Sequence, residues 1–146
     1  MDLDRYQPRV AATLVEDFYP NGRKAGESRQ ITCPYCRMQH SHGAVLGHRT
    51  AHCADSVAKR HQVVDPRDTR TTPGYVLCEP ADEINWQLEY VYGQLHVLRN
   101  RYRRLSVEYE RMSPWTAREK RVKQNLRSEL DSIATVLRKA GVSLND

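Results

Sequence analysis

Apolar side chains recur at alternating steps of four and three residues between positions 84 and 112, and this is the most regular pattern in the 146-residue chain. Such steps mark the a and d positions of heptads, which form the seam of a coiled coil. They predict a helix over about residues 83–112, with Asp82 as N-cap and an end at Ser113-Pro114, since proline cannot continue a helix. The seam positions are Ile84, Leu88, Val91, Leu95, Leu98, Tyr102, Leu105, Tyr109 and Met112.

A second apolar series follows the proline and predicts a helix over about residues 115–140, with Ser113 or a neighbour as N-cap and Gly141 after its C-terminus. Two long helices joined by a tight corner predict an antiparallel hairpin. The alternative is that each helix joins a bundle with another chain, and the heptads are compatible with a homodimer through the helices. The second series is Val122, Leu126, Leu130, Ile133, Leu137, Ala140 and Leu144.

Cysteine and histidine are concentrated between residues 33 and 53, which is the strongest chemical signal in the chain. Cys33 and Cys36 form a C-x2-C knuckle, which presents two thiolates to one tetrahedral metal ion. His48, His52 and Cys53 follow at a distance close to zinc-finger spacing. If residues 48–53 are helical, His48 and His52 share one face. We therefore predict a structural Zn²⁺ site drawn from these five residues.

The fourth ligand of this site stays open at the sequence level. His40 and His42 compete for the remaining place, and Cys78 is a more distant option. Catalysis is disfavoured: Cys-Pro-Tyr-Cys is also a glutaredoxin tetrapeptide, but no βαβ pattern follows it. The spacing of an HNH nuclease is not evident either. Structural zinc contributes about 10 kcal/mol to folding, which would offset a small core.

The front part of the chain is rich in turn formers, and only 39% of the whole chain is apolar. The predicted fold class is α+β: a small zinc-stabilised β-rich module over residues 1–80, followed by an antiparallel two-helix coiled-coil hairpin over residues 81–146. Within the module we expect a hairpin with a long, mobile tip, a zinc knuckle, a short helix and a short strand. The expected elements are strands at 12–19, 29–32 and 75–78, and a helix at 48–61.

The motifs HSHG, GHRTAHC and GYVL resemble a group of small zinc-binding proteins, mostly uncharacterised, from actinobacteria and their phages and mobile elements. The resemblance covers about residues 30–78 and carries no established activity. It implies metal ligands at Cys33, Cys36, Cys53 and one histidine, with His42, His48 and His52 as the choices.

The predicted helices carry two further groups of residues that suggest binding. Basic residues gather toward the corner, with Arg103 and Arg104 expected beside Arg121 and Lys123; they are either a solvated face or a site for phosphates or an acidic protein. An apolar stripe through Trp86, Tyr90, Gly93 and Val97 needs a cover, which is either the zinc module or a partner. Trp115 is either a staple between the helices or an exposed anchor for a partner. The basic residues are Arg99, Arg101, Arg103, Arg104, Arg118, Lys120, Arg121 and Lys123.

The longest apolar run, residues 10–15, is too short for a bilayer, which needs about 20 residues. The polar start is not a secretory signal, so we expect a cytoplasmic protein. The predicted function is a non-enzymatic, zinc-binding regulatory protein of phage or mobile-element type that associates with nucleic acid through its basic hairpin. The alternative is a protein-binding adaptor whose hairpin docks on a larger machine such as RNA polymerase or a recombinase.

Overall fold

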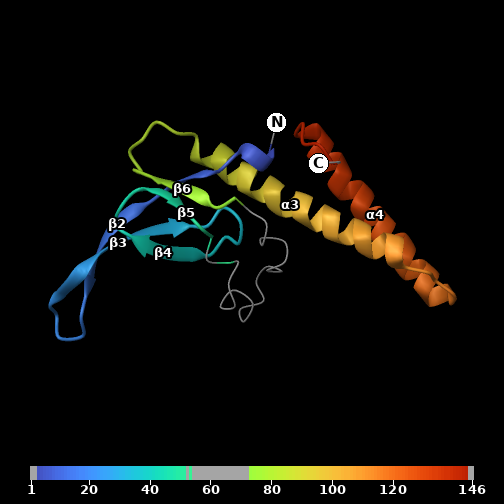
Figure 1. The fold of residues 1–146 in the computed structure, drawn as a ribbon, viewed down its shortest axis with the longest axis horizontal. Coiled ribbons are helices and arrows are strands. Elements are labelled where there is room, and N and C mark those ends of the chain that lie inside the picture. Colours follow the sequence, from blue (N-terminus) through green and yellow to red (C-terminus); the bar gives the residue numbers. More distant parts are fainter. Residues whose placement is uncertain (1–2, 52, 54–72, 145–146) are drawn as a thin grey trace.

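The fold is that of a computed structural model, which describes residues 3–51, 53 and 73–144. The predicted α+β class with a C-terminal helical hairpin is confirmed. In the described residues every strand precedes position 80 and both α-helices follow it. The strands and the hairpin therefore lie at opposite ends of an elongated molecule (Figure 1).

The strands form two three-stranded sheets, in the orders β1-β6-β5 and β2-β3-β4. The first sheet pairs β1 and β6 in parallel, with Val10 opposite Leu77, and β5 runs antiparallel to β6. The second is antiparallel throughout. The strands are β1 (Arg9–Ala11), β2 (Thr13–Phe18), β3 (Lys24–Thr32), β4 (Gln39–Gly43), β5 (Gly47–Arg49) and β6 (Tyr75–Cys78), and a short 3-10 helix, η1 (Leu3–Arg5), precedes them.

The β2–β3 hairpin has a longer return strand and a shorter tip than predicted. Strand β3 begins at Lys24 rather than at Arg29. The tip is closed by hydrogen bonds from the Tyr19 N–H to the Arg23 carbonyl, at 2.8 Å, and from the Gly22 N–H to the Tyr19 carbonyl, at 2.9 Å. Charged residues suggested a loop here, but they lie on exposed positions of a strand, where charge is tolerated.

The helix predicted over residues 48–61 does not start where expected. His48 and Arg49 belong to β5, where they pair with Val76 and Tyr75 of β6. Residues 52 and 54–61 lie outside the described residues. The local sequence is compatible with a helix, but pairing with a distant strand decides the backbone at this point.

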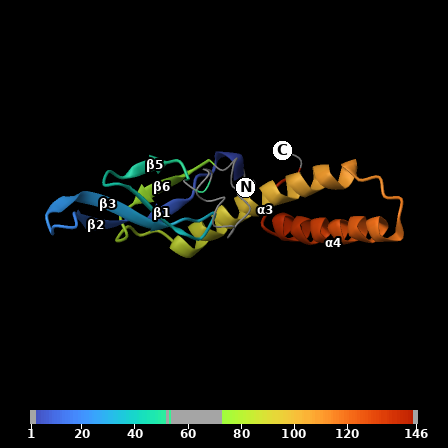
Figure 2. The same ribbon diagram turned by 90° about the horizontal axis from the view of Figure 1, so that it is seen from below.

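The two helices are α3 (Trp86–Arg111) and α4 (Ala117–Lys139), and they pack side by side as an antiparallel hairpin (Figures 1 and 2). Leu3 from η1 joins the end of their core. Within the described ranges, neither helix has the apolar length needed to cross a bilayer. The buried core consists of Leu3, Leu95, Leu105, Leu130, Ile133, Leu137 and Val142.

The helix ends are capped by neighbours of the predicted residues. Asn85, not Asp82, caps α3 by accepting a hydrogen bond from the Leu88 N–H at 3.1 Å. Thr116, not Ser113, caps α4 in a capping box with Glu119. At the other end of α4, Gly141 adopts φ +73° and follows the helix as predicted. The hydrogen bonds from residues 141 and 142 to the carbonyls of residues 138 and 137 form a Schellman motif.

Helix α4 covers only the second part of the α3 seam. Leu88 and Val91 at the start of the seam have exposed fractions of 43% and 48%. The corner of the hairpin is the segment 112–116 between the two helices. Beside it, Lys123 donates to the Met112 carbonyl at 3.0 Å and lies 4.6 Å from the centre of the Tyr109 ring. Lys123 is therefore beside the end of α3 and not, as predicted, beside Arg103 and Arg104. The backbone at both ends of the connecting segment is extended, so α4 starts farther from the end of α3 than a tight corner would place it.

The first half of α3 packs against the strands and not against α4 (Figure 2). Gly93 is buried there, and a Cβ at this position would lie 2.6 Å from Pro34 Cβ and from the Pro34 carbonyl oxygen. Val97, also on α3, packs against the buried hydrophobic core of the strands. Glycine permits this close approach of helix and loop, and the predicted apolar stripe thus has its cover within the chain.

A buried carboxylate also fixes α3 to the N-terminal segment. Glu89 is 3% exposed and accepts hydrogen bonds from the Tyr6 hydroxyl at 2.5 Å, the Arg9 N–H at 2.8 Å and the Arg9 guanidinium at 2.7 Å. Burial raises the pKa of Glu89, but these hydrogen bonds outweigh it and the net pKa is lowered. The buried His96 Nε2 lies 3.0 Å from the Tyr6 carbonyl oxygen, so the junction is polar as well as apolar.

Candidate metal centre

The first two cysteines lie on a tight turn between β3 and β4. The Arg37 N–H donates to the Cys33 carbonyl at 3.0 Å, and the Cys33 N–H donates to the Met38 carbonyl at 2.8 Å. Arg37 adopts φ +67°, which reverses the chain immediately after Cys36. The Tyr35 N–H points at Cys33 Sγ at 3.4 Å and would stabilise negative charge on that sulfur. The C-x2-C spacing thus forms the predicted knuckle.

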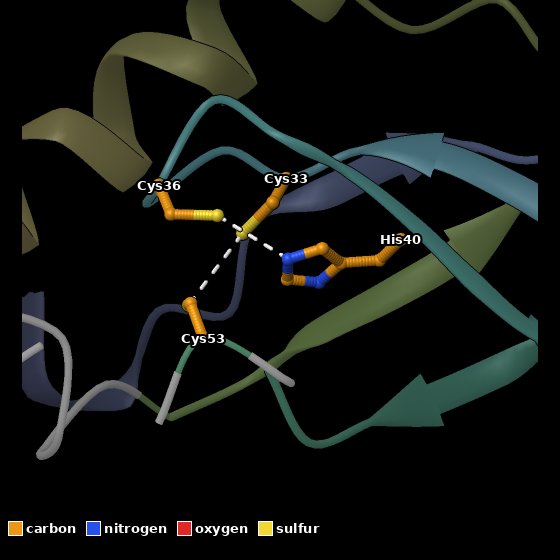
Figure 3. Close-up of side chains that lie close together, drawn as sticks. All are labelled: Cys33, Cys36, His40 and Cys53. Carbon is orange, nitrogen blue, oxygen red and sulfur yellow. Dashed lines mark hydrogen bonds between the residues drawn. The ribbon is translucent and has the colours of Figure 1, made fainter. Parts of the chain in front are cut away.

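Four side chains converge on one point beside this knuckle: Cys33, Cys36, His40 and Cys53 (Figure 3). Their ligand atoms all lie within 4.8 Å of one another. Cys33 Sγ is 3.9 Å from Cys53 Sγ, and Cys36 Sγ is 3.2 Å from His40 Nε2. Zinc–sulfur bonds of about 2.3 Å place two sulfurs of a tetrahedron about 3.8 Å apart. The cluster is a possible metal site, and its donor set and spacing fit zinc.

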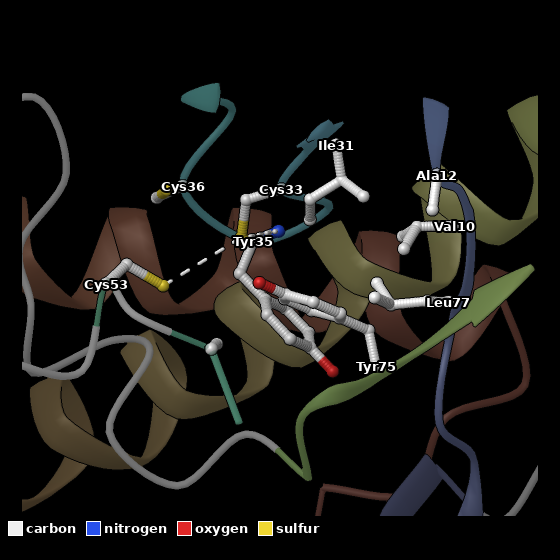
Figure 4. Close-up of a cluster of buried hydrophobic side chains, with 10 residues drawn as sticks. Val10, Ala12, Ile31, Cys33, Tyr35, Cys36, Cys53, Tyr75 and Leu77 are labelled. Atoms are coloured by element: carbon white, nitrogen blue, oxygen red, sulfur yellow. Dashed lines mark hydrogen bonds between the residues drawn. The ribbon is translucent and has the colours of Figure 1, made fainter. Parts of the chain in front are cut away.

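The three cysteines of the cluster are buried, and His40 is half-buried. Cys33, Cys36 and Cys53 have exposed fractions of 0%, 4% and 2%. The three cysteines belong to the core of the strand end, with Tyr35 and Tyr75 packed beside them (Figure 4). Three thiols crowded in this space perturb one another: the hydrogen bond between Cys33 and Cys36 raises the pKa of Cys33 and lowers the pKa of Cys36.

His40 is oriented by a second group of hydrogen bonds. Its Nδ1 lies 3.0 Å from the Tyr75 hydroxyl, which in turn lies 2.6 Å from His42 Nε2. Burial raises the pKa of Tyr75, so its hydroxyl keeps its proton and can donate it to His42. In the tautomer in which His40 Nδ1 donates to Tyr75, Nε2 would be the nitrogen available to a metal ion, and it lies on the side of the three sulfurs. Histidine ligands of metals are commonly fixed in this way.

Three of the five predicted ligands, Cys33, Cys36 and Cys53, are brought together, and the histidine that joins them is His40. His48 lies elsewhere, with its Nε2 3.0 Å from the Pro73 carbonyl. The prediction of His48 depends on helical spacing, but residues 47–49 form strand β5. His52 lies outside the described residues.

Of the three alternatives for the fourth ligand, His40 is in the cluster, and His42 and Cys78 are not. His42 contacts the Tyr75 hydroxyl, which lies between it and His40. Cys78 is half-buried, and its sulfur lies 3.7 Å from the Val76 carbonyl oxygen. A local signal for His40 exists in the sequence. It follows Cys36 by four residues, which is the distance needed to leave the knuckle and enter the next strand.

The predicted binding residues of the hairpin fall into different environments. Arg99 is 4% exposed and so cannot contribute to a surface. Arg101 pairs with Glu129 across the helices. Trp86 and Tyr90 are half-buried and line a cavity of about 200 Å³ against β1 and Pro34, so they face the strands. The remaining predicted basic residues lie nearer the corner: Arg103, Arg104 and Lys123 are half-exposed, and Arg118, Lys120 and Arg121 are exposed.

Comparisons of the chain with protein-family models, with curated proteins and with solved structures found no match. What the protein does must therefore be inferred from its own residues and their geometry.

Proposed function

We propose that Cys33, Cys36, His40 and Cys53 bind one Zn²⁺ whose role is structural. The support is a complete set of four protein donors in a buried space. A catalytic zinc has three protein ligands and an open position for water or substrate, whereas here a fourth donor closes the set and three of the four side chains are at most 4% exposed. Zinc bound by such a set contributes about 10 kcal/mol or more to folding.

The same zinc would hold the base of the hairpin in place. The knuckle residues between the two cysteines contact α3 directly: Gln94 Nε2 donates to the Pro34 carbonyl at 2.5 Å and to the Tyr35 carbonyl at 3.2 Å. The Arg37 guanidinium donates back to Gln94 Oε1 at 3.0 Å. An ordered knuckle would therefore fix the direction in which the hairpin projects.

We propose further that the far half of the hairpin binds the phosphates of nucleic acid. The observation that carries this proposal is the distribution of charge. Of the 23 basic and 18 acidic residues in the chain, nine and three lie within residues 101–127, which leaves 14 and 15 elsewhere. The whole positive charge of the protein thus comes from one end of an elongated molecule, the arrangement that attracts a polyanion.

Charge reversal at the corner tests this proposal. The variant Arg118→Glu/Arg121→Glu changes two exposed residues of α4, and Arg23→Glu/Lys139→Glu makes the same change in net charge at exposed sites away from the corner. If about four phosphates are contacted, wild-type affinity for a DNA oligonucleotide falls roughly 100-fold between about 50 and 200 mM salt. The corner variant should lose at least about tenfold at low salt, and the control much less. Equal losses in the two variants would contradict the proposal.

A second candidate function is a protein-binding adaptor, as the sequence also suggests. The observation in its favour is the uncovered start of the α3 seam, where Leu88 and Val91 are exposed on a surface that elsewhere accepts a helix. With either function, we propose a protein of phage or mobile-element type, and the support for this is the resemblance over residues 30–78. No binding to DNA or RNA at low salt, together with a specific protein partner lost on Leu88→Glu, would favour the adaptor.

A further inference from the structure

The corner of the hairpin presents an aromatic side chain on a fixed backbone. Trp115 has an exposed fraction of 88%, the highest of the large apolar side chains in the part of the chain that the structure describes. Its backbone N–H donates to Glu119 Oε2 at 2.7 Å, as part of the capping interactions that begin α4. The backbone is thus held in one place while the indole ring is left in water.

This exposure is not explained by the stability of the hairpin. The core of α3 and α4 is filled by leucine, isoleucine and tyrosine, and Trp115 is not among the residues packed on it. The other tryptophan, Trp86, is half-buried against the strands. A large apolar side chain kept in water at a projecting corner is typical of a contact with a ligand or partner.

The charges around Trp115 are of one dominant sign. Arg111 ends α3 four residues before it, and Arg118, Lys120 and Arg121 lie in the first turns of α4, all exposed. The one acidic residue in this stretch is Glu119. Its carboxylate accepts hydrogen bonds from the backbone N–H groups of Trp115 and Thr116, and these hydrogen bonds lower its pKa. A negatively charged ligand with flat apolar groups fits this combination.

We propose that the corner binds single-stranded nucleic acid, with Trp115 stacking on an unpaired base while Arg118 and Arg121 contact the flanking phosphates. This deepens the proposed function and rests on it. Single strands are favoured because their bases offer an accessible face, whereas both faces of a base inside a duplex are covered by its neighbours. Exposed aromatic rings beside basic side chains are the common means of binding single strands without sequence preference.

Fluorescence of Trp115 provides the direct test. In the variant Trp86→Phe, Trp115 is the only tryptophan, so its emission reports stacking. We expect a short oligothymidylate to quench this emission, and a blunt duplex of the same length to quench it much less. In the otherwise unchanged protein, Trp115→Ala should weaken binding to oligothymidylate at least about fivefold and Trp115→Phe by less. Neither change should lower the thermal stability, because the ring is in water.

The outcomes separate this inference from the function on which it depends. If oligothymidylate and duplex both bind with steep salt dependence but Trp115→Ala weakens neither, phosphate binding stands and the stacking inference is overturned. If neither oligonucleotide binds at low salt, both proposals fail and Trp115 is left as an anchor for a protein. Quenching by oligothymidylate, with a loss in Trp115→Ala that Trp115→Phe partly restores, supports base stacking.

Discussion

The strand end and the hairpin end of this protein are stabilised in different ways. The hairpin core is made of leucine and isoleucine side chains that repeat along two helices, so each turn adds its own contribution. The core of the strand end consists of three cysteines, two alanines, two tyrosines and only three branched aliphatic residues. The proposed zinc site lies within this second core, so a single substitution should have very different effects at the two ends.

Helix α3 belongs to both ends of the molecule. Its first turns carry Glu89 and Gly93, which face the strands, and the part from Leu95 onward carries Leu95 and Leu105, which belong to the core shared with α4 and the N-terminal 3-10 helix. If the strand end unfolds, the second half of α3 keeps its partner. If the hairpin core is weakened, the first half keeps its partner.

Loss of the metal site should have the largest effect. In Cys33→Ser a neutral hydroxyl replaces a fully buried thiolate donor, and zinc worth about 10 kcal/mol of folding free energy is weakened or lost. We expect the strand signals to disappear from the amide NMR spectrum while those of the hairpin, from about residue 95 to 139, persist. Elemental analysis should give one zinc per chain for the wild type and much less for the variant.

The matched control is Cys78→Ser, since Cys78 is half-buried and its sulfur lies outside the cluster. This variant should keep its zinc and change stability by about 1 kcal/mol or less. A Cys33→Ser protein that retains one zinc and a folded strand end would show that this end does not depend on the four-residue site.

The sequence predicts the hairpin better than it predicts the strands, and the reason is the range of the interactions. The heptad seam and the glycine after α4 are local patterns, and both helices and the Gly141 motif are where the patterns indicate, within a few residues. The parallel pairing of β1 with β6 joins residues 9–11 to residues 76–78. No turn connects them, so no short segment of sequence predicts that pairing.

In the candidate metal site, too, some residues are determined by local sequence and others by long-range contacts. Cys33 and Cys36 are fixed by the local knuckle and were predicted with it. The histidine was not fixed, because the selection of His40 depends on strand β4 placing it above the knuckle and on Tyr75, which is 35 residues further on. The sequence thus identifies all three cysteines of the candidate site, and the tertiary structure selects the histidine.

Substitution of Leu137 should give the second largest effect and leave the strand end unchanged. Leu137 is fully buried between the helices, so Leu137→Ala should cost about 2–5 kcal/mol. Its neighbour Val136 is 48% exposed, and Val136→Ala should change stability by about 0.5 kcal/mol or less. Urea unfolding followed by helical circular dichroism measures both, and zinc content should be normal in both. Equal costs at the two positions would show that the predicted seam does not stabilise the hairpin.

The junction should give a smaller effect that depends on pH. Glu89→Gln keeps the shape of the side chain but removes the charge that accepts hydrogen bonds from Tyr6 and Arg9. The expected loss at neutral pH is about 1–3 kcal/mol. Because Arg9 is half exposed, it can be solvated in the variant. Glu108→Gln, at an exposed position on the same helix, should have almost no effect.

The sign of the pH dependence follows from the lowered pKa of Glu89 in the folded protein. A carboxyl group whose pKa is lower when folded stabilises the fold above its unfolded value of 4.5, and this stabilisation is lost as the pH falls through the folded pKa. The difference in unfolding free energy between wild type and Glu89→Gln should therefore be constant above that value and shrink below it. Loss of zinc in acid affects both proteins alike, so the difference isolates Glu89. A difference that does not change on acidification would mean that the charge of Glu89 does not hold the two ends together, and that close packing at Gly93 does so instead.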